Sequence, residues 1–278
     1  MNPIIKFAAL PAAAIAGGTA FLVAPGHYTE AMKAPFADRN YAHRGLHKKD
    51  KSVPENSLGA FQAAVDAGYG IELDVHLTAD DQLVVFHDDT LKRVCGVAGR
   101  TDDKTLAELK ALHLHGTEYT IPTLDEALDV LAGKVPLILE IKRGKQAKRN
   151  ALLCRLIRER LRSYDGPVCI ESFDPAIVAW WRRNAPEVLR GQLSQPPKLY
   201  YKNSSHLTGF LCGNLLTNVF ARPHFIAYCI GKKPFTVQLC EHLGALRACW
   251  TSRKWEHENG NDMVIFEHYR PNVWFEAK

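Results

Sequence analysis

The chain has 278 residues, of which 46% are hydrophobic and 23% are charged. This composition excludes a disordered or fibrous protein, and the length suits one barrel-sized domain of roughly 250 residues with a short appendage. The formal net charge of +5 is compatible with an acidic substrate or an anionic membrane, and it gives no reason to expect a nucleic-acid partner. Nor does the sequence imply a protein partner. The seven cysteines show no CxxC pair, so we expect buried free thiols and, from them, a reducing compartment.

Residues 1–24 are interpreted as a membrane anchor or a signal-like segment. Residues 4–24 are apolar or small apart from Lys6 and one threonine, and this length is close to the ~20 residues that cross a bilayer as a helix. A cleaved signal peptide and a peripheral helix are the alternatives, but the run ends in an alanine–proline pair that suits cleavage poorly. Lys33 and Arg39 beyond the run slightly favour a cytoplasmic location for the following domain. We therefore expect one N-terminal hydrophobic helix that anchors the protein in a membrane.

Residues 25–38 contain two prolines and no periodicity, so they are interpreted as a linker to a domain that spans residues 39–278. In that domain strand-like and helix-like segments alternate, which is typical of an α/β fold with a largely parallel sheet. The strands are expected at 40–43, 70–76, 83–87, 135–141, 167–172, 189–193, 224–230 and 246–251. The helices are expected at 57–67, 124–131, 148–162, 175–184 and 235–243.

The first of these helices is expected to be capped by Asn56 and stopped by Gly68. Eight strands with helices between most of them favour a TIM-type (β/α)8 barrel. A doubly wound open sheet is the alternative, because hydrophobic periodicity does not separate the two architectures.

One connection between strands is too short for a crossover helix. Only residues 77–82 separate two of the expected strands, so the segment predicts a β-hairpin that turns at residues 79–82. If the turn centres between its two aspartates, Asp74 lies opposite His87. The hairpin then brings a carboxylate and an imidazole to the same end of the barrel.

Acidic side chains stand inside two otherwise apolar strands. Glu72 and Asp74 are two residues apart, so both leave their strand by one face. Two buried carboxylates repel each other unless a positive charge lies between them, and oxygen ligands favour Mg²⁺ or Ca²⁺ over zinc. Glu140 repeats the pattern as a third ligand, with Lys142 on the same face for a phosphate oxygen. An exposed acidic pair and a structural Glu140–Lys142 ion pair are the alternatives.

Histidines end two of the expected strands. Histidine is a residue type able to titrate near neutral pH, so a pair such as His43 and His87 suits acid–base hydrolysis of a phosphodiester. Arg44 is a fitting phosphate clamp because its planar guanidinium binds two oxygens at once. A lone histidine is more often structural, but active sites of barrels lie at the carboxyl ends of the strands, where both of these histidines stand. His76 shares the face of the strand acids and is expected to make a minor contact at most.

Six ordered motifs together resemble the glycerophosphodiester phosphodiesterase family. They are Ala42-His43-Arg44-Gly45, Val53-Pro54-Glu55-Asn56-Ser57, Glu72-Leu73-Asp74-Val75, Val85-Phe86-His87-Asp88, Ile121-Pro122-Thr123-Leu124 and Glu140-Ile141-Lys142. The resemblance is continuous over about residues 40–142 and weaker afterwards, through residues 172–175 and 248–251. It implies a TIM barrel with a small insertion at residues 88–120.

The resemblance also implies the chemistry. One divalent cation, Mg²⁺ or Ca²⁺, would be held by the three strand acids, with His43 and His87 as the acid–base pair. A glycerophosphodiester would be hydrolysed to an alcohol and sn-glycerol 3-phosphate. Arg44, Lys142 and Trp250 would contact the substrate.

Two departures from the family pattern concern selectivity. The closing strand ends in Glu267-His268-Tyr269 where the family has a threonine–aspartate-type sequence, and residues 195–222 match no pattern. Because the expected anchor brings the domain to a membrane, a lysophospholipase D-type activity on lipids is an alternative function. An inactive membrane-tethered receptor for polyol phosphates is a second alternative.

Overall fold

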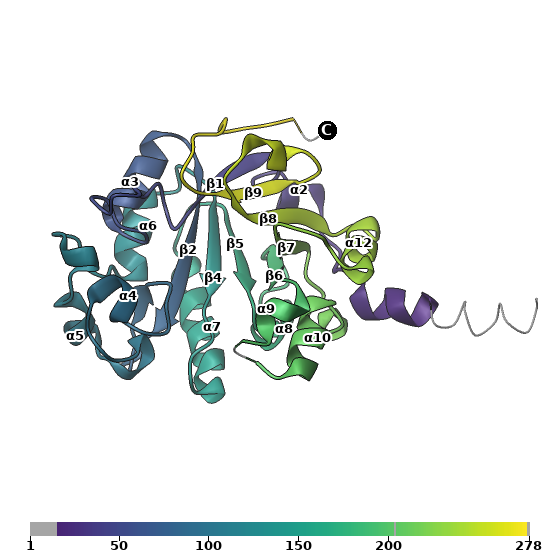
Figure 1. Ribbon diagram of the computed structural model, residues 1–278, viewed down its shortest axis with the longest axis horizontal. Coiled ribbons are helices and arrows are strands. Elements are labelled where there is room, and N and C mark those ends of the chain that lie inside the picture. Colours follow the sequence, from purple (N-terminus) through teal and green to yellow (C-terminus); the bar gives the residue numbers. More distant parts are fainter. Residues whose placement is uncertain (1–15, 203, 277–278) are drawn as a thin grey trace, which may run out of the picture.

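A computed structural model describes residues 16–202 and 204–276 (Figure 1). Eight parallel strands pair in the closed order β1-β2-β4-β5-β6-β7-β8-β9, and β1 pairs with both β2 and β9. The strands are β1 (Arg39–His43), β2 (Gly70–Leu77), β4 (Leu137–Ile141), β5 (Val168–Ser172), β6 (Arg190–Ser194), β7 (Phe225–Cys229), β8 (Leu246–Ser252) and β9 (Met263–Phe266). The closed ring confirms the predicted TIM-type barrel and excludes the open sheet.

One predicted strand is not part of this ring. β3 (Leu83–Val85) pairs antiparallel with β2 outside the barrel, as the hairpin prediction requires. The eighth barrel strand is instead β9, which periodicity did not predict and which was noted only as the closing strand of the family resemblance. The chain therefore has the expected number of barrel strands, but one of them lies elsewhere in the sequence.

The register of the hairpin differs from the prediction by one residue. The Phe86 N–H donates to the Asp74 carbonyl at 3.0 Å, and the pairing of β2 with β3 places Asp74 opposite Phe86 rather than His87. The cause is the turn, which centres on Asp80 because Asp81 takes a left-handed conformation with φ of 61°.

Five helices cover the outside of the ring, each within one residue of its predicted bounds: α3 (Leu58–Asp66), α6 (Leu124–Leu131), α7 (Ala147–Leu161), α8 (Pro175–Asn184) and α12 (Phe235–His242). The patternless connection from β6 to β7 forms three short helices, α9 (Pro197–Tyr200), α10 (His206–Gly213) and α11 (Asn218–Ala221). The described residues between β8 and β9 form only a 3₁₀ turn, η3 (Trp255–Glu258).

The start of α3 corrects a detail of the prediction. Its N-cap is Ser57, whose hydroxyl accepts from the Ala60 N–H at 3.2 Å. Asn56 was expected in this role, but it has φ of 54°, and its amide donates to Asp74 at 2.8 Å. Gly68, with φ of 78°, follows the end of the helix as expected.

The segment between β3 and α6 has a small apolar core of its own. It contains α4 (Lys92–Cys95), η1 (Thr101–Asp103), α5 (Leu106–Lys110) and η2 (Leu114–Gly116). Their buried residues pack against the hairpin in one cluster: Val84, Phe86, Leu91, Val94, Leu109, Leu114 and Ile121. This cluster fixes the loop that follows β3, where His87 stands.

Side chains alternate between the two faces of every barrel strand. The inner face is filled by an apolar layer that includes Tyr41, Ile138, Cys169, Phe225 and Ile265. The outer face packs against the helices. Toward the carboxyl ends of β1, β2, β4 and β5, the inward-facing residues become polar. The apolar core of the barrel is therefore covered by polar groups at that end. The seven cysteines are unpaired and five are buried, as expected.

The N-terminal part contributes to the fold. Residues 16–23 are helical, and Val23 is fully buried among apolar side chains of β7 and α12. Residues 25–38 contain a one-turn helix, α2 (Glu30–Lys33). Most of the predicted anchor falls on residues 1–15, which lie outside the described residues. Within the described part, no helix has the length and apolarity needed to cross a membrane.

Candidate active site

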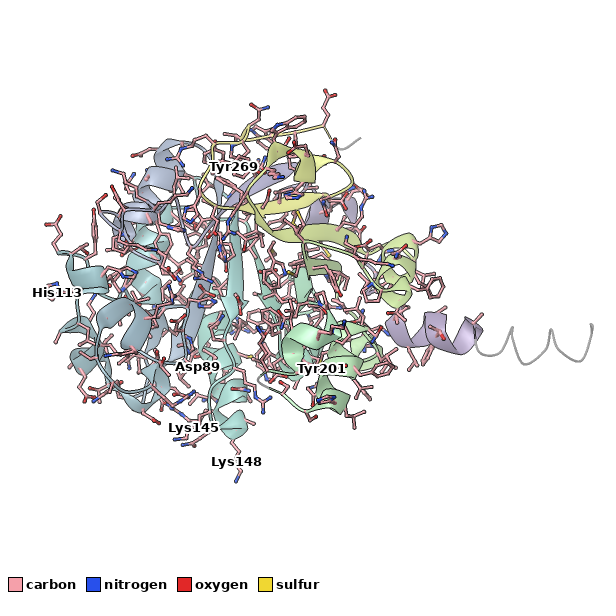
Figure 2. All side chains as sticks on the ribbon, in the orientation of Figure 1. Asp89, His113, Lys145, Lys148, Tyr201 and Tyr269 are labelled. Atoms are coloured by element: carbon pink, nitrogen blue, oxygen red, sulfur yellow. The ribbon has the colours of Figure 1, made fainter. Side chains whose placement is uncertain are left out.

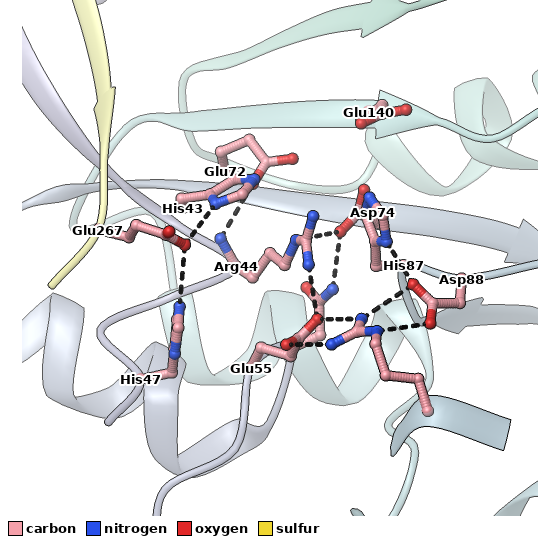
Figure 3. Close-up of polar contacts among 12 residues, drawn as sticks. His43, Arg44, His47, Glu55, Glu72, Asp74, His87, Asp88, Glu140 and Glu267 are labelled. Carbon is pink, nitrogen blue, oxygen red and sulfur yellow. Dashed lines mark hydrogen bonds and ion pairs between the residues drawn. The ribbon is translucent and has the colours of Figure 1, made fainter. Parts of the chain in front are cut away.

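Three carboxylates meet inside the barrel at the carboxyl ends of two neighbouring strands (Figure 3). β2 supplies Glu72 and Asp74, and β4 supplies Glu140, the register partner of Asp74. Their solvent-exposed fractions are 2%, 0% and 7%, so the alternative of an exposed acidic pair is wrong. One oxygen of each lies within 4.8 Å of the others. Oxygen atoms in this arrangement fit a hard divalent cation.

The pKa shifts of these three acids show that burying their negative charges together is unfavourable. Burial, followed by repulsion from Asp74 and Glu140, raises the pKa of Glu72 well above its usual value. Burial also raises the pKa of Glu140. Burial would raise the pKa of Asp74 too, but the charges of Lys142 and its other neighbours outweigh it and hold that pKa well below the usual range. Three ionised carboxylates therefore carry more negative charge than the neighbouring cations neutralise.

The two positive side chains expected to bind phosphate, Lys142 and Arg44, both contact these carboxylates. Lys142 Nζ is 2.8 Å from Glu140 Oε1 and 3.2 Å from Asp74 Oδ1, so the structural ion pair considered as an alternative is present. Arg44 Nη1 donates to Glu55 at 2.6 Å, and its Nε is 3.6 Å from Asp74 Oδ2. Both positive side chains therefore border the acidic cluster.

His43 is held at the carboxyl end of β1 in a neutral state. Its Nδ1 is 3.2 Å from Glu267 Oε2, directly after β9. Burial, then the charge of Arg44, lowers the pKa of His43 to about 4, although Glu267 acts against the change. A neutral imidazole at neutral pH is the form that accepts a proton.

His87 has a different environment on the other side of the carboxylates. Its Nδ1 is 2.7 Å from Asp88 Oδ1, and Arg93 holds the same carboxylate through Nε at 2.7 Å. Burial would raise the pKa of Asp88, but hydrogen bonds from His87 and Arg93 lower it, so Asp88 stays ionised. The contact through Nδ1 fixes the ring of His87 and leaves its other nitrogen available for a proton transfer. Although it lies one register position from the predicted place, the charge of His87 still acts on Asp74 and Glu140.

Arg93 belongs to a chain of ion pairs that sequence reasoning missed. Its Nη1 donates to Glu55 Oε2 at 2.8 Å, and Glu55 in turn accepts from Arg44. This series of ion pairs thus connects Arg44 to Asp88 beside His87 (Figure 3). The sequence signal for these contacts is the Pro-Glu-Asn motif of residues 54–56. An acid and an amide just before the start of a helix are suited to contacts outside that helix.

Two further acids were not assigned a role from the sequence. Glu171 on β5 pairs in register with Glu140, is 1% exposed and has no hydrogen-bond partner at Oε2. Burial and the neighbouring acids raise its pKa well above the usual value. An acid in an apolar strand, the pattern that identified Glu140, would have identified it. Glu267 was noted only as a departure from the family pattern, and its contact with His43 depends on barrel closure.

Two other predicted positions lie further from the carboxylates. Trp250 on β8 donates from Nε1 to the Ala227 carbonyl at 3.0 Å, and its ring packs edge-on against Phe173 at 5.6 Å. His76 is buried, and burial lowers its pKa to about 4. Its Nε2 is 3.4 Å from the His87 carbonyl, so it supports the loop of His87.

Comparisons with known proteins agree with this geometry. The sequence profile described as the glycerophosphoryl diester phosphodiesterase family matches residues 43–271. A glycerophosphodiester phosphodiesterase of Caldanaerobacter subterraneus is 37% identical over 164 residues, which cover 55% of this chain and 65% of that protein. A lysophospholipase D of Rattus norvegicus is 32% identical over 161 residues, which cover 52% of this chain and 48% of that protein. The chain thus matches less than two thirds of either relative.

The fold of the barrel has a close counterpart among solved structures. A phosphodiesterase of Oleispira antarctica, in complex with the product sn-glycerol-3-phosphate, superimposes with a TM-score of 0.66. It is 25% identical, and the match covers 83% of this chain and 93% of that one. The profile match extends over most of the barrel, from His43 at the end of β1 to the segment after β9, and the chain therefore belongs to the glycerophosphoryl diester phosphodiesterase family.

Proposed function

We propose that the protein hydrolyses glycerophosphodiesters to sn-glycerol 3-phosphate and an alcohol. The observation that carries this proposal is the placement of three buried carboxylates between a neutral His43 and an Asp88-bonded His87. Family membership supports the reaction, and the similar Oleispira structure holds sn-glycerol-3-phosphate as its product.

The carboxylates fit one divalent cation, either Mg²⁺ or Ca²⁺. Glu72, Asp74 and Glu140 would hold it, because their oxygens converge and are otherwise neutralised incompletely. When bound, such a cation withdraws negative charge from a phosphoryl oxygen. Lys142 and Arg44 would then be released from part of their carboxylate contacts and could hold the remaining phosphoryl oxygens.

The two histidines divide the proton transfers. Glu267 fixes Nδ1 of His43, so the other ring nitrogen is left to take a proton from the nucleophile, which is either water or the glycerol hydroxyl of the substrate. Asp88 fixes Nδ1 of His87, so the opposite nitrogen gives a proton to the leaving alkoxide. Neither transfer requires a charged group to leave the barrel.

The test is an assay of glycerophosphocholine and lysophosphatidylcholine, first in EDTA and then with Mg²⁺ or Ca²⁺ restored. The proposal expects no turnover in EDTA and recovery with the metal, with glycerophosphocholine as the better substrate. Equal activity in the chelator and in the metal would contradict the metal-dependent mechanism. No turnover of either substrate under any metal condition would favour the inactive receptor.

Lysophospholipase D activity is the second candidate. The match to the rat lysophospholipase D favours it, as does the apolar sequence of residues 4–24, which would attach the protein to a membrane. Preferential turnover of lysophosphatidylcholine in the same assay would establish it. A cytoplasmic location of the barrel remains a prediction, which protease protection in sealed cells would test.

A further inference from the structure

Large apolar side chains are exposed on one side of the barrel. We call them the apolar face: Phe21, Leu207, Phe210, Phe220 and Phe235. They belong to the helix of residues 16–23, to α10 and α11, and to the start of α12. Phe220 and Phe235 are 69% and 71% exposed, which is unusual for rings of this size. Figure 1 shows α10, α12 and the purple N-terminal helix on the right-hand side of the molecule.

Hydrogen bonds join the segments that carry the apolar face. Arg222, which follows α11, donates to the carbonyls of Phe21 and Ala24, and its guanidinium lies 4.8 Å from the Phe21 ring centre. Thr236 in α12 donates to Asn214 at the end of α10 at 3.3 Å. The face is therefore one fixed surface rather than a set of separate loops.

The same region is basic. The sequence contains no Asp or Glu between Glu187 and Glu241, a stretch that includes the whole β6–β7 connection. Lys198, Lys202 and Lys232 in this stretch are exposed. Tyr201, beside the second of these lysines, is labelled in the lower part of Figure 2, away from His113 of the insertion at the left edge. Positive charge around exposed aromatic rings is the composition of surfaces that enter the headgroup region of anionic membranes.

We propose that the apolar face docks on the surface of an anionic lipid bilayer. The sequence that precedes the helix of residues 16–23 supports a bilayer over a protein partner, because residues 4–15 are apolar apart from Lys6. Phenylalanine rings would enter the acyl boundary while lysines stay at the headgroups.

One end of the apolar face borders the mouth of the barrel, and the other end, with Phe21 and Phe220, lies before the amino end of β7. The face includes α10, and α9 and α10 leave the carboxyl end of β6, where the mouth lies. Tyr200 at the end of α9 packs edge-on against Phe173, with ring centres 6.3 Å apart, and Phe173 follows β5 at the same rim. The α10 end of the apolar face thus adjoins the rim of the barrel mouth.

The experiment measures binding of the full chain to vesicles and requires no turnover, so it is independent of the proposed reaction. Partition is measured by flotation with phosphatidylcholine vesicles and with vesicles that also contain phosphatidylglycerol. The variants are Phe210→Ser with Phe235→Ser, and Lys198→Glu with Lys202→Glu. The matched controls are Val97→Ser and Lys92→Glu, exposed positions at α4 on the opposite side of the molecule.

We expect each lost phenylalanine to weaken partition about tenfold. Each reversed lysine should weaken it by at least about fivefold on the anionic vesicles alone. The controls should bind like the wild type. Unchanged partition of the double phenylalanine variant would overturn the proposal and leave the N-terminal segment as the sole attachment. A wild type that is dimeric without lipid and becomes monomeric on the phenylalanine changes, with partition unchanged, would assign the face to a second copy instead.

Discussion

The different partners of the two histidines allow their roles to be separated by the choice of leaving group. His43 is buried with a pKa of about 4, so at pH 7 its neutral form exceeds the protonated form by about a thousand to one. A divalent cation nearby would also lower the pKa of His43. His87 is bonded through Nδ1 to the ionised Asp88. We therefore expect His43 to act as the base and His87 as the acid.

Replacement of His87 by alanine removes the proton donor for the leaving group. Turnover of glycerophosphocholine, whose leaving alkoxide needs a proton, should fall about 10²–10⁴-fold, or about 3–5 kcal/mol in activation free energy. A glycerophosphodiester with a p-nitrophenyl leaving group should be affected much less, because that group departs as a stable anion. His43→Ala should slow both substrates to the same extent. Asp88→Asn, which keeps the size and removes the charge, should reproduce a smaller part of the His87 defect.

The assay compares kcat/KM of the three variants on the two substrates at pH 7 with saturating metal. Circular dichroism controls for folding. A leaving-group-dependent defect in His43→Ala in place of His87→Ala would exchange the two roles. Equal defects of both variants on both substrates would refute the assignment of an acid to either histidine.

Three further predictions concern the charges around the site. Asp74→Asn and Glu140→Gln should each abolish turnover and the thermal stabilisation by metal. For the wild type at a metal concentration of a hundred times Kd, this stabilisation is about 2.7 kcal/mol, or about 5–11 °C in Tm. An equal rise of Tm in the variants would exclude these ligands. Lys142→Met removes the cation that two buried carboxylates share, so it should lower the free energy of unfolding in EDTA by about 3–5 kcal/mol. Added Mg²⁺ or Ca²⁺ should restore most of that loss in urea titrations, and a loss unaffected by metal would place the ion elsewhere. Burial would raise the pKa of Glu55, but its arginine partners outweigh burial and lower it to about 2. The depressed pKa stabilises the fold above about pH 4.5, and this stabilisation disappears as the pH falls through 2. Between pH 5 and 2 the wild type should therefore lose about 3 kcal/mol more stability than Glu55→Gln, and equal losses in urea titrations would contradict this role.

The barrel and its inward-facing acids could be predicted because they depend on local periodicity. Glu72 and Asp74 must share a face in any strand that contains both, and the apolar residues between them indicate burial. The hairpin register could not be fixed in the same way. It depends on whether Asp81 takes the left-handed conformation, and a shift of half a residue in the turn moves the partner of Asp74 by a full position.

Contacts across the closed ring were beyond prediction for a different reason. Glu267 meets His43 only because β9 pairs with β1, and the four-residue β9 has too weak a pattern to be recognised alone. The ion-pair chain of Arg93 and Glu55 likewise depends on how the insertion folds back on the hairpin. Such partners are set by tertiary closure, which a single sequence shows only through family resemblance.

The burial of Val23 has a practical consequence for the preparation of shortened forms of the protein. This side chain is fully covered by β7 and α12, a burial that typically stabilises a fold by about 1.5–3 kcal/mol. Asn218 also donates to the Val23 carbonyl at 3.1 Å, and the Gly26 N–H donates to Pro223 at 2.8 Å. A recombinant form that starts at the first barrel strand would lose these contacts and expose an apolar patch to aggregation. Expression boundaries should therefore be set before residue 16, with detergent in place of deletion to handle the apolar sequence ahead of it.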